Sequence, residues 1–143
     1  MLYADTSVLV SYYVSDANSA RATAAVNAAA EPFAFTALHR LEIRNALDLA
    51  VFRKRITSVQ AEAAWRDVIR DVRARLLMSV TPDWRRVFRD AARLAAKHSA
   101  TIGTRSFDIL HVAAARDLAV GDFYSFDGRQ VALARAIGLR VLP

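Results

Sequence analysis

The chain of 143 residues is long enough for one domain with its own core, and its 20 basic and 14 acidic residues leave a net charge of +6. The absence of cysteine excludes disulfides and thiolate metal sites and is typical of a reducing cytoplasm. No apolar run reaches the roughly 18 residues of a membrane-spanning helix, and Asp5 lies where a signal peptide would be apolar, so we expect a single cytoplasmic domain over residues 1–143 with no membrane partner.

The first half of the chain predicts short apolar strands separated by helices. Polar or proline-containing breaks such as Glu31-Pro32 mark where elements end. Apolar residues at helical spacing predict a helix with Ser58 as its N-cap; they are Trp65, Ile69, Val72 and Leu76. The expected elements are a strand at 2–4, helices at 6–14, 19–30, 38–53 and from 58, and strands at 33–36 and 77–80.

The second half continues the alternation of helix and strand. We expect an amphipathic helix marked by Trp84, Val87, Phe88, Ala91 and Ala95, a loop at 99–105, a helix at 106–119, a strand at 123–126, a helix at 129–137 with Gly138 as its C-cap, and a strand at 139–141. Alternating strands and helices indicate an α/β fold in which a mostly parallel sheet is covered on both faces. In such sheets the ligand site lies at the carboxyl ends of the strands.

Two acids directly follow predicted strands. Asp5 comes after the strand at 2–4, and Asp127 comes after the strand at 123–126, so both are expected at the edge where such folds place chemistry. Asp5 is equally explained as the N-cap of the next helix, and Asp127 as a turn residue in FDGR. Asp122 lies at the opposite end of its strand and is not included.

Two further acids lie on predicted helices. Asp108 is in the first turn of the helix at 106–119, where the helix dipole favours an anion even without a further role. Glu42 shares a helix face with Leu38, Asn45 and Leu49, which predicts that it points toward the protein rather than into water. Each position has an ordinary structural explanation, but all four acids are placed to converge on one end of one sheet.

Converging carboxylates repel one another. At neutral pH, such a cluster must therefore either bind protons or be neutralised by a cation. A site of oxygen ligands selects hard ions, which makes Mg²⁺ or Mn²⁺ the expected guest. Such ions activate water and stabilise charge on a phosphodiester. Because arginine, which matches phosphate geometry, supplies all the basic residues except Lys54 and Lys97, the pattern favours a metal-dependent nuclease. Biased codon usage is the competing explanation for the arginines, which are spread over several helices.

Four stretches occur in order along the chain: LYADTSVLV, LHRLEIRNAL, SFDILHVAAA and YSFDGRQVALARAIGLRVLP. Together they resemble the PIN domain, and the size and layout resemble the VapC-type toxins of bacterial toxin–antitoxin pairs. The similarity covers essentially the whole chain. It implies a three-layer α/β/α PIN-like domain with a central, mostly parallel sheet of about five short strands.

The resemblance places the family's acidic quartet on Asp5, Glu42, Asp108 and Asp127. In the family these acids coordinate one or two Mg²⁺ or Mn²⁺ ions, and the resemblance points to Asp5 and Asp108 as the most direct ligands. It also implies an endoribonuclease that forms a homodimer. A cognate antitoxin is expected to silence it by laying its C-terminal segment across the acidic site.

Other polar residues near the quartet have weaker assignments. Ser7, in the position of the family's small polar residue, is an auxiliary candidate, although it is equally explained as a helix-start residue. Arg44, Arg105 and Arg129 are candidate phosphate contacts because they are near the quartet in sequence. The three histidines, at positions 39, 98 and 111, are expected to be structural or surface residues, since metal-activated water needs no histidine base.

The residues argue against two other functions and leave two alternatives within the PIN resemblance open. A haloacid dehalogenase-type phosphatase needs a second aspartate two residues after Asp5, where this chain has Ser7. A phospho-accepting receiver needs a lysine late in a strand, whereas Lys54 and Lys97 fall in or beside predicted helices. A catalytically silent PIN-like binding module stays open, as does a housekeeping RNA-processing nuclease without an antitoxin.

Overall fold

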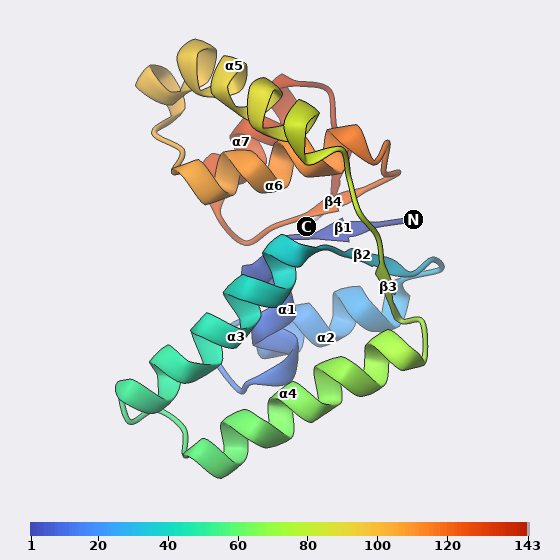
Figure 1. Ribbon diagram of the computed structural model, residues 1–143, viewed down its shortest axis with the longest axis vertical. Helices are drawn as coiled ribbons and strands as arrows, with labels where there is room; N and C mark the ends of the chain where they lie inside the picture. The colour runs from blue at the N-terminus through green and yellow to red at the C-terminus, as the bar shows by residue number, and fades with distance from the viewer. Residues whose placement is uncertain (143) are drawn as a thin grey trace. The chain divides into compact units, whose positions relative to one another are not determined.

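The computed structural model describes residues 1–142, and its residues form two compact units (Figure 1). The terminal unit comprises Met1–Asp5 and the chain from Thr81 onward, so it is built from both ends of the sequence. The central unit is the intervening segment Thr6–Val80. Each unit is described separately below.

A three-stranded parallel sheet forms the base of the terminal unit. Strand β4 (Phe123–Tyr124) lies between β1 (Tyr3–Ala4) and β5 (Val141–Leu142). In this register Ala4 pairs with Tyr124, and Tyr124 pairs with Leu142. Because all three strands are parallel, their carboxyl ends lie at one edge of the sheet.

Three helices complete the terminal unit: α5 (Trp84–Ile102), α6 (Ser106–Asp117) and α7 (Gly128–Ala136). Helix α5 runs beside α6 (Figure 1) and buries Val87, Ala91 and Leu94. Helix α6 is mostly apolar and buries residues on more than one face, among them Val112 and the alanines at 113–115. An apolar helix of this kind is typical of a domain core.

The boundaries of several of these elements differ from the sequence prediction. Helix α5 continues through the expected loop at 99–105 as far as Ile102, because the left-handed residue that ends it is Gly103, with φ of 75°. Helix α7 has Ile137 as its C-cap, and Gly138, predicted as the cap, follows with φ of 85°. The last strand accordingly begins at Val141 rather than at 139.

The central unit contains a two-stranded parallel sheet, β2 (Phe33–Phe35) and β3 (Leu77–Ser79). Its helices are α1 (Thr6–Tyr13), α2 (Ser19–Ala28), α3 (Ala37–Phe52) and α4 (Ser58–Arg73). The N-cap of α4 is Thr57, which accepts a hydrogen bond from the Gln60 N–H, so the prediction of Ser58 was wrong by one residue.

The α/β class predicted from the sequence is confirmed, and residues 1–142 contain five short strands whose pairings are all parallel. Within the described residues the strands form two sheets, of three and two strands, one in each unit. No helix among residues 1–142 is both long and apolar enough to span a membrane.

Candidate active site

Asp5 lies at the carboxyl edge of the terminal unit's sheet, directly after β1. Its N–H donates to the Tyr124 carbonyl at 2.9 Å, which extends the pairing with β4 by one residue. Its carboxylate is buried and accepts a hydrogen bond from Ser125 Oγ to Oδ2 at 2.9 Å. A buried carboxylate needs such partners, because an unpaired one carries a large desolvation cost.

Ser125 joins two of the predicted acids. While it donates to Asp5, its hydroxyl oxygen accepts from the Asp127 N–H at 3.0 Å. The serine side chain is therefore fixed by the Asp5 carboxylate on one side and the Asp127 backbone N–H on the other, and it holds the segment after β4 against Asp5. Ser125 was not predicted as a site residue, because the strand was expected to continue to residue 126, whereas β4 ends at Tyr124.

Asp127 is the N-cap of α7. Its Oδ1 accepts from the backbone N–H groups of Arg129 at 2.8 Å and Gln130 at 3.2 Å. Its Oδ2 lies 3.6 Å from Nη2 of Arg105. Asp127 thus fills the ordinary capping role and still presents a second oxygen to a cation.

Asp108 lies in the first turn of α6, as predicted from the sequence. Its Oδ2 accepts from the Arg105 backbone N–H at 3.2 Å and from Arg105 Nε at 3.0 Å. The Asp108 carbonyl accepts from Nε2 of Gln130 at 3.3 Å, and the Gln130 side chain is fully buried. Gln130 therefore ties the start of α6 to the start of α7, each of which carries one of the acids.

Arg105 brings a positive charge between two of these carboxylates. Its Nε contacts Asp108 and its Nη2 faces Asp127, while 72% of its side chain remains exposed. An arginine between two acidic side chains offsets their mutual repulsion. The position shows that this part of the site accepts a cation.

The donor set fits a hard divalent ion, because the carboxylates of Asp5, Asp108 and Asp127 offer only oxygen. Among residues 1–142, no three acidic or histidine side chains are grouped closely enough to form a ready-made metal centre. Arg105 holds the space between two of the acids instead. The carboxylates are therefore chemically suited to Mg²⁺ or Mn²⁺, while the arginine competes for them.

Glu42 belongs to the central unit, where it lies on α3. Its Oε2 accepts from Thr6 Oγ1 at 2.7 Å, and Thr6 is buried at the start of α1. The predicted apolar face was wrong, because Asn45 is exposed and Leu49 is 37% exposed. The buried face of α3 is instead formed by Leu38, His39, Ile43 and Leu47, and Glu42 lies half-buried at its edge.

The candidate phosphate contacts differ in how they are held. Arg44 donates to Asp48 at 3.0 Å and to Glu62 at 2.7 Å, so a phosphate would compete with two carboxylates for it. Arg129 is exposed, and its guanidinium donates to the Gly103 carbonyl at 3.2 Å. The auxiliary candidate Ser7 is exposed on α1.

The histidines and Asp122 have structural positions. His39 completes the capping box of α3, with its ring accepting from the Thr36 N–H at 3.1 Å. His111 is buried beside Tyr3, whose hydroxyl lies 2.9 Å from His111 Nδ1. His98 lines a surface pocket on α5. Asp122 is paired with Arg140, which agrees with its exclusion from the predicted site.

Comparison with known proteins places these features in a family. The sequence profile described as the PIN domain matches residues 2–136. No curated protein sequence matches the chain. The fold resembles the Mycobacterium tuberculosis VapC20 crystal structure, described as a sarcin-ricin loop cleaving toxin, with a TM-score of 0.65, 18% identity, and coverage of 92% of this chain and 94% of that one. It also resembles FitAcB from Neisseria gonorrhoeae, with a TM-score of 0.64, 15% identity, and coverage of 100% and 97%.

Proposed function

Because the chain belongs to the PIN domain family, we propose that it is a metal-dependent endoribonuclease that acts as the toxin of a toxin–antitoxin pair. The observation that carries this proposal is the connected set of acids at the carboxyl edge of the sheet. Ser125 links Asp5 to Asp127, and Arg105 links Asp127 to Asp108. A parallel α/β sheet places chemistry at this edge.

The proposed site holds Mg²⁺, with Mn²⁺ as a substitute, on Asp5, Asp108, Glu42 and Asp127. When bound, the metal supplies activation of water and neutralisation of phosphate charge. Glu42 is included because Thr6, to which it is hydrogen bonded, is the next residue after Asp5 in the chain. In this proposal Ser125 and Thr6 orient carboxylates, and neither contacts the phosphate.

The chain's own cations have a separate role in the proposal. Arg105 and Arg129 lie beside Asp108 and Asp127 and are both exposed. Their guanidinium groups match the oxygen geometry of a phosphodiester and can hold it in place while water attacks. Release of Arg105 from the two acids would accompany metal binding, because both cations use the same carboxylates.

The toxin assignment rests on the resemblance to VapC-type proteins, supported by the name of the VapC20 structure. We propose RNA as the substrate, a homodimer as the assembly and the cytoplasm as the location. We also propose a cognate antitoxin whose C-terminal segment covers the acidic site. The alternatives are a housekeeping PIN-type RNA-processing nuclease and a catalytically silent binding module.

Cleavage of total cellular RNA by the purified protein tests this proposal. We expect cutting in Mg²⁺ or Mn²⁺ that stops with EDTA and falls at least about a hundredfold in Asp108→Asn, because the variant loses a charged oxygen ligand. Asp67→Asn is the matched control, since Asp67 is a half-exposed acid on α4 paired with Arg70 and lies in the central unit.

Cutting that survives Asp108→Asn would point to a contaminant or to a different site. If the wild-type protein cuts no RNA under any of these conditions, the binding-module alternative replaces the enzyme. Co-expression with the product of a neighbouring reading frame separates the toxin from the housekeeping nuclease, because only a toxin is silenced by such a partner.

A further inference from the structure

Helix α5 carries a regular row of basic side chains. Arg85, Arg89, Arg93 and Lys97 recur at every fourth position, and all four are exposed. At 1.5 Å per residue the row extends over roughly 18 Å along the helix. We call these four residues the α5 basic row.

Acidic side chains in the terminal unit only partly neutralise this surface. Asp90 contacts Arg116 at 3.0 Å, and it lies 3.5 Å from each of Arg89 and Arg93. One carboxylate therefore serves three guanidinium groups. Neighbouring Arg86, which is not part of the row, is paired with Asp117.

Two members of the row have no acidic partner in the part of the chain that the structure describes. Arg85 and Lys97 form no ion pair within residues 1–142, so their charge is available to an anion from solution. An ordinary solvated helix face would balance positive and negative side chains at neighbouring positions. This face instead keeps a surplus of positive charge along its length.

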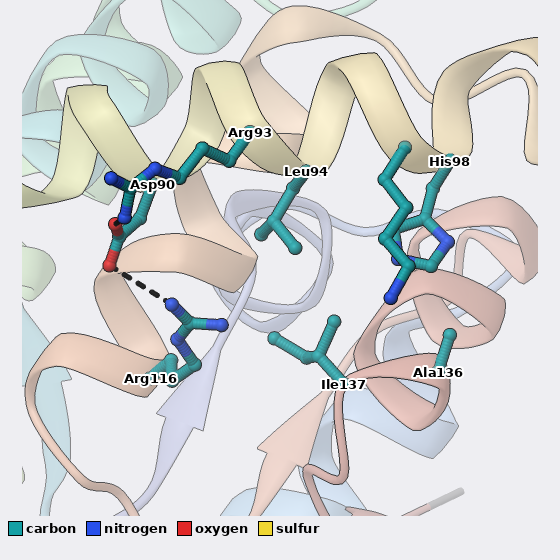
Figure 2. Close-up of a pocket in the computed structure, with 8 residues that line it drawn as sticks. Asp90, Arg93, Leu94, His98, Arg116, Ala136 and Ile137 are labelled. Carbon is teal, nitrogen blue, oxygen red and sulfur yellow. Dashed lines mark hydrogen bonds and ion pairs between the residues drawn. The ribbon is translucent and has the colours of Figure 1, made fainter.

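The surface beside the row is hollowed in two places. A pocket of about 450 Å³ is lined by Asp83, Arg85, Arg86 and Arg89. A second pocket of about 310 Å³ lies between α5, α6 and α7, and it contains Arg93, Lys97, His98 and Arg116 with Asp90 at one side. In Figure 2 the side chains of Leu94 and Ile137 point into this second pocket. A basic rim around an apolar floor suits a phosphate joined to a sugar or base.

Aromatic rings lie next to the start of the row. Trp84 and Phe88 are one helical turn apart on α5, with ring centroids separated by 6.4 Å, and Phe88 is 58% exposed. Exposed aromatic side chains beside arginines are typical of surfaces on which single-stranded bases stack. An acidic protein segment would also bind the basic side chains, but it would have no use for the aromatic rings. The rings therefore favour RNA over an acidic peptide as the ligand.

The row leads toward the candidate active site within the same unit. Lys97 lies near the end of α5, which is closed by Gly103. The Gly103 carbonyl accepts a hydrogen bond from the Arg129 guanidinium, and Arg129 is in the first turn of α7, where Asp127 is the N-cap. RNA that leaves the acids past Gly103 would therefore meet the basic row beyond the last turn of α5.

We propose that the α5 basic row binds the phosphate backbone of single-stranded RNA that flanks the cleavage point, with its two pockets receiving successive nucleotides. The inference rests on the proposed ribonuclease function and adds a binding surface outside the acids. Affinity from this surface is electrostatic and depends strongly on salt, because phosphate contacts release counterions. Sequence preference is not expected from it.

The test is the salt dependence of RNA binding by the full chain in EDTA, which prevents cleavage. The probe is a fluorescein-labelled single-stranded RNA of mixed sequence and roughly 20 nucleotides, followed by fluorescence anisotropy. The row variant is Arg85→Gln, Arg93→Gln and Lys97→Gln combined. The control variant combines Arg53→Gln, Arg66→Gln and Arg73→Gln, which removes the same charge from exposed positions of the central unit.

For the row variant we expect roughly tenfold weaker RNA binding at low salt. We also expect the plot of log K against log salt concentration to be less steep by about 2, because each of the three lost phosphate contacts contributes about 0.7 to the slope. The control should keep the wild-type slope. Combining Arg85→Lys with Arg93→Lys preserves both charges and should bind like the wild type, and thermal melting of every variant verifies folding.

The possible contrary results are distinct. Equal losses in the row and control variants would mean that net charge alone drives binding and would overturn the inference. If the wild type cleaves RNA but the row variant binds RNA with the wild-type salt slope, the inference is overturned and the proposed function stands. No wild-type binding at any salt concentration, together with no cleavage, would overturn both. Tighter binding of polyglutamate than of RNA, lost only in the row variant, would assign the surface to an acidic protein instead.

Discussion

At the scale of single residues, Arg105 has the most direct effect on charge at the site. Its guanidinium lies against Asp108 and faces Asp127, where a divalent ion would also be attracted. Metal and arginine therefore compete for the same oxygen atoms. The apparent metal affinity of the protein includes the free energy of separating this ion pair, which is modest because the arginine is largely exposed.

We predict that Arg105→Gln binds Mn²⁺ several-fold more tightly than the wild type, because the competing cation is gone. Titration calorimetry with Mn²⁺ measures this directly and does not depend on catalysis. Arg105→Lys is the control, since it keeps the charge and should keep an affinity close to that of the wild type. Weaker Mn²⁺ binding by Arg105→Gln would show that Arg105 supports the metal rather than competing with it.

Ser125 and Arg105 mark the limit of what could be predicted about the site from single residues in the sequence. Asp5 does follow a strand and Asp108 does lie in the first turn of a helix, because such positions are set by local pattern, and with Asp127 they fall in the terminal unit. The links between them were not foreseen. Ser125 bonds to the nearby Asp127 N–H within its own loop, but it becomes a bridge only when Asp5 approaches it from 120 positions away, and nothing local in the sequence records that approach.

At the scale of elements, α5 and α6 are joined by ion pairs near the end of α6. Arg86 of α5 pairs with Asp117 of α6, and Arg116 of α6 pairs with Asp90 of α5. The hydrogen bond from Arg86, together with that from the Asp83 N–H, lowers the pKa of Asp117 below its usual value, although burial opposes this. The Asp117 carboxylate is therefore preferentially ionised in the folded state.

This shift predicts a loss of stability in acid. A carboxyl group whose pKa is lowered by folding stabilises the protein above its unfolded pKa of about 3.9, and that contribution is lost as the pH falls through the folded pKa. We expect the wild-type Tm to fall between about pH 5 and about pH 3, and to fall less in Asp117→Asn. Thermal melts followed by circular dichroism test this, with Asp67→Asn as the control. Identical pH profiles for wild type and Asp117→Asn would contradict the prediction.

Element boundaries were least predictable where the stop signal is weak. Apolar periodicity gave α4 and α6 to within a few residues, because a buried stripe imposes a regular pattern. Helix α5 was predicted too short, since Ser99 and Thr101 resemble loop residues although Gly103 is the actual terminator. The opposite error occurred at β4, which was predicted two residues too long, so that Ser125 was assigned to the strand and not to the site.

At the scale of the whole molecule, the terminal unit is closed by the two ends of the chain. Strand β1 pairs with β4 about 120 positions later, as the register of Tyr3 with Phe123 shows. Such a pairing carries a large loop-closure cost and is not encoded in any local pattern. This is why the sequence predicted the parallel strands but not their division into sheets of three and two.

Tyr3 is the side chain that secures this closure. It is fully buried, stacks on Phe123 with centroids 5.7 Å apart, and its hydroxyl lies 2.9 Å from His111 Nδ1. It therefore connects the first strand to the fourth and to α6. The residue that follows Ala4 on this strand is Asp5, so the anchoring of β1 also determines the position of a proposed metal ligand.

We predict that Tyr3→Ala lowers the free energy of unfolding by about 3–5 kcal/mol, as is usual when a buried aromatic ring is removed. Tyr3→Phe keeps the stacking and loses one hydrogen bond, which predicts a loss of only about 1 kcal/mol. Urea denaturation followed by circular dichroism measures both values. Because a domain is stable by only about 5–15 kcal/mol, the alanine variant should also lose cleavage activity well below the wild-type Tm. Equal and small effects of the two substitutions would show that β1 is not anchored through this ring, and the position of Asp5 would then depend on its own bonds, including those to Ser125 and Tyr124.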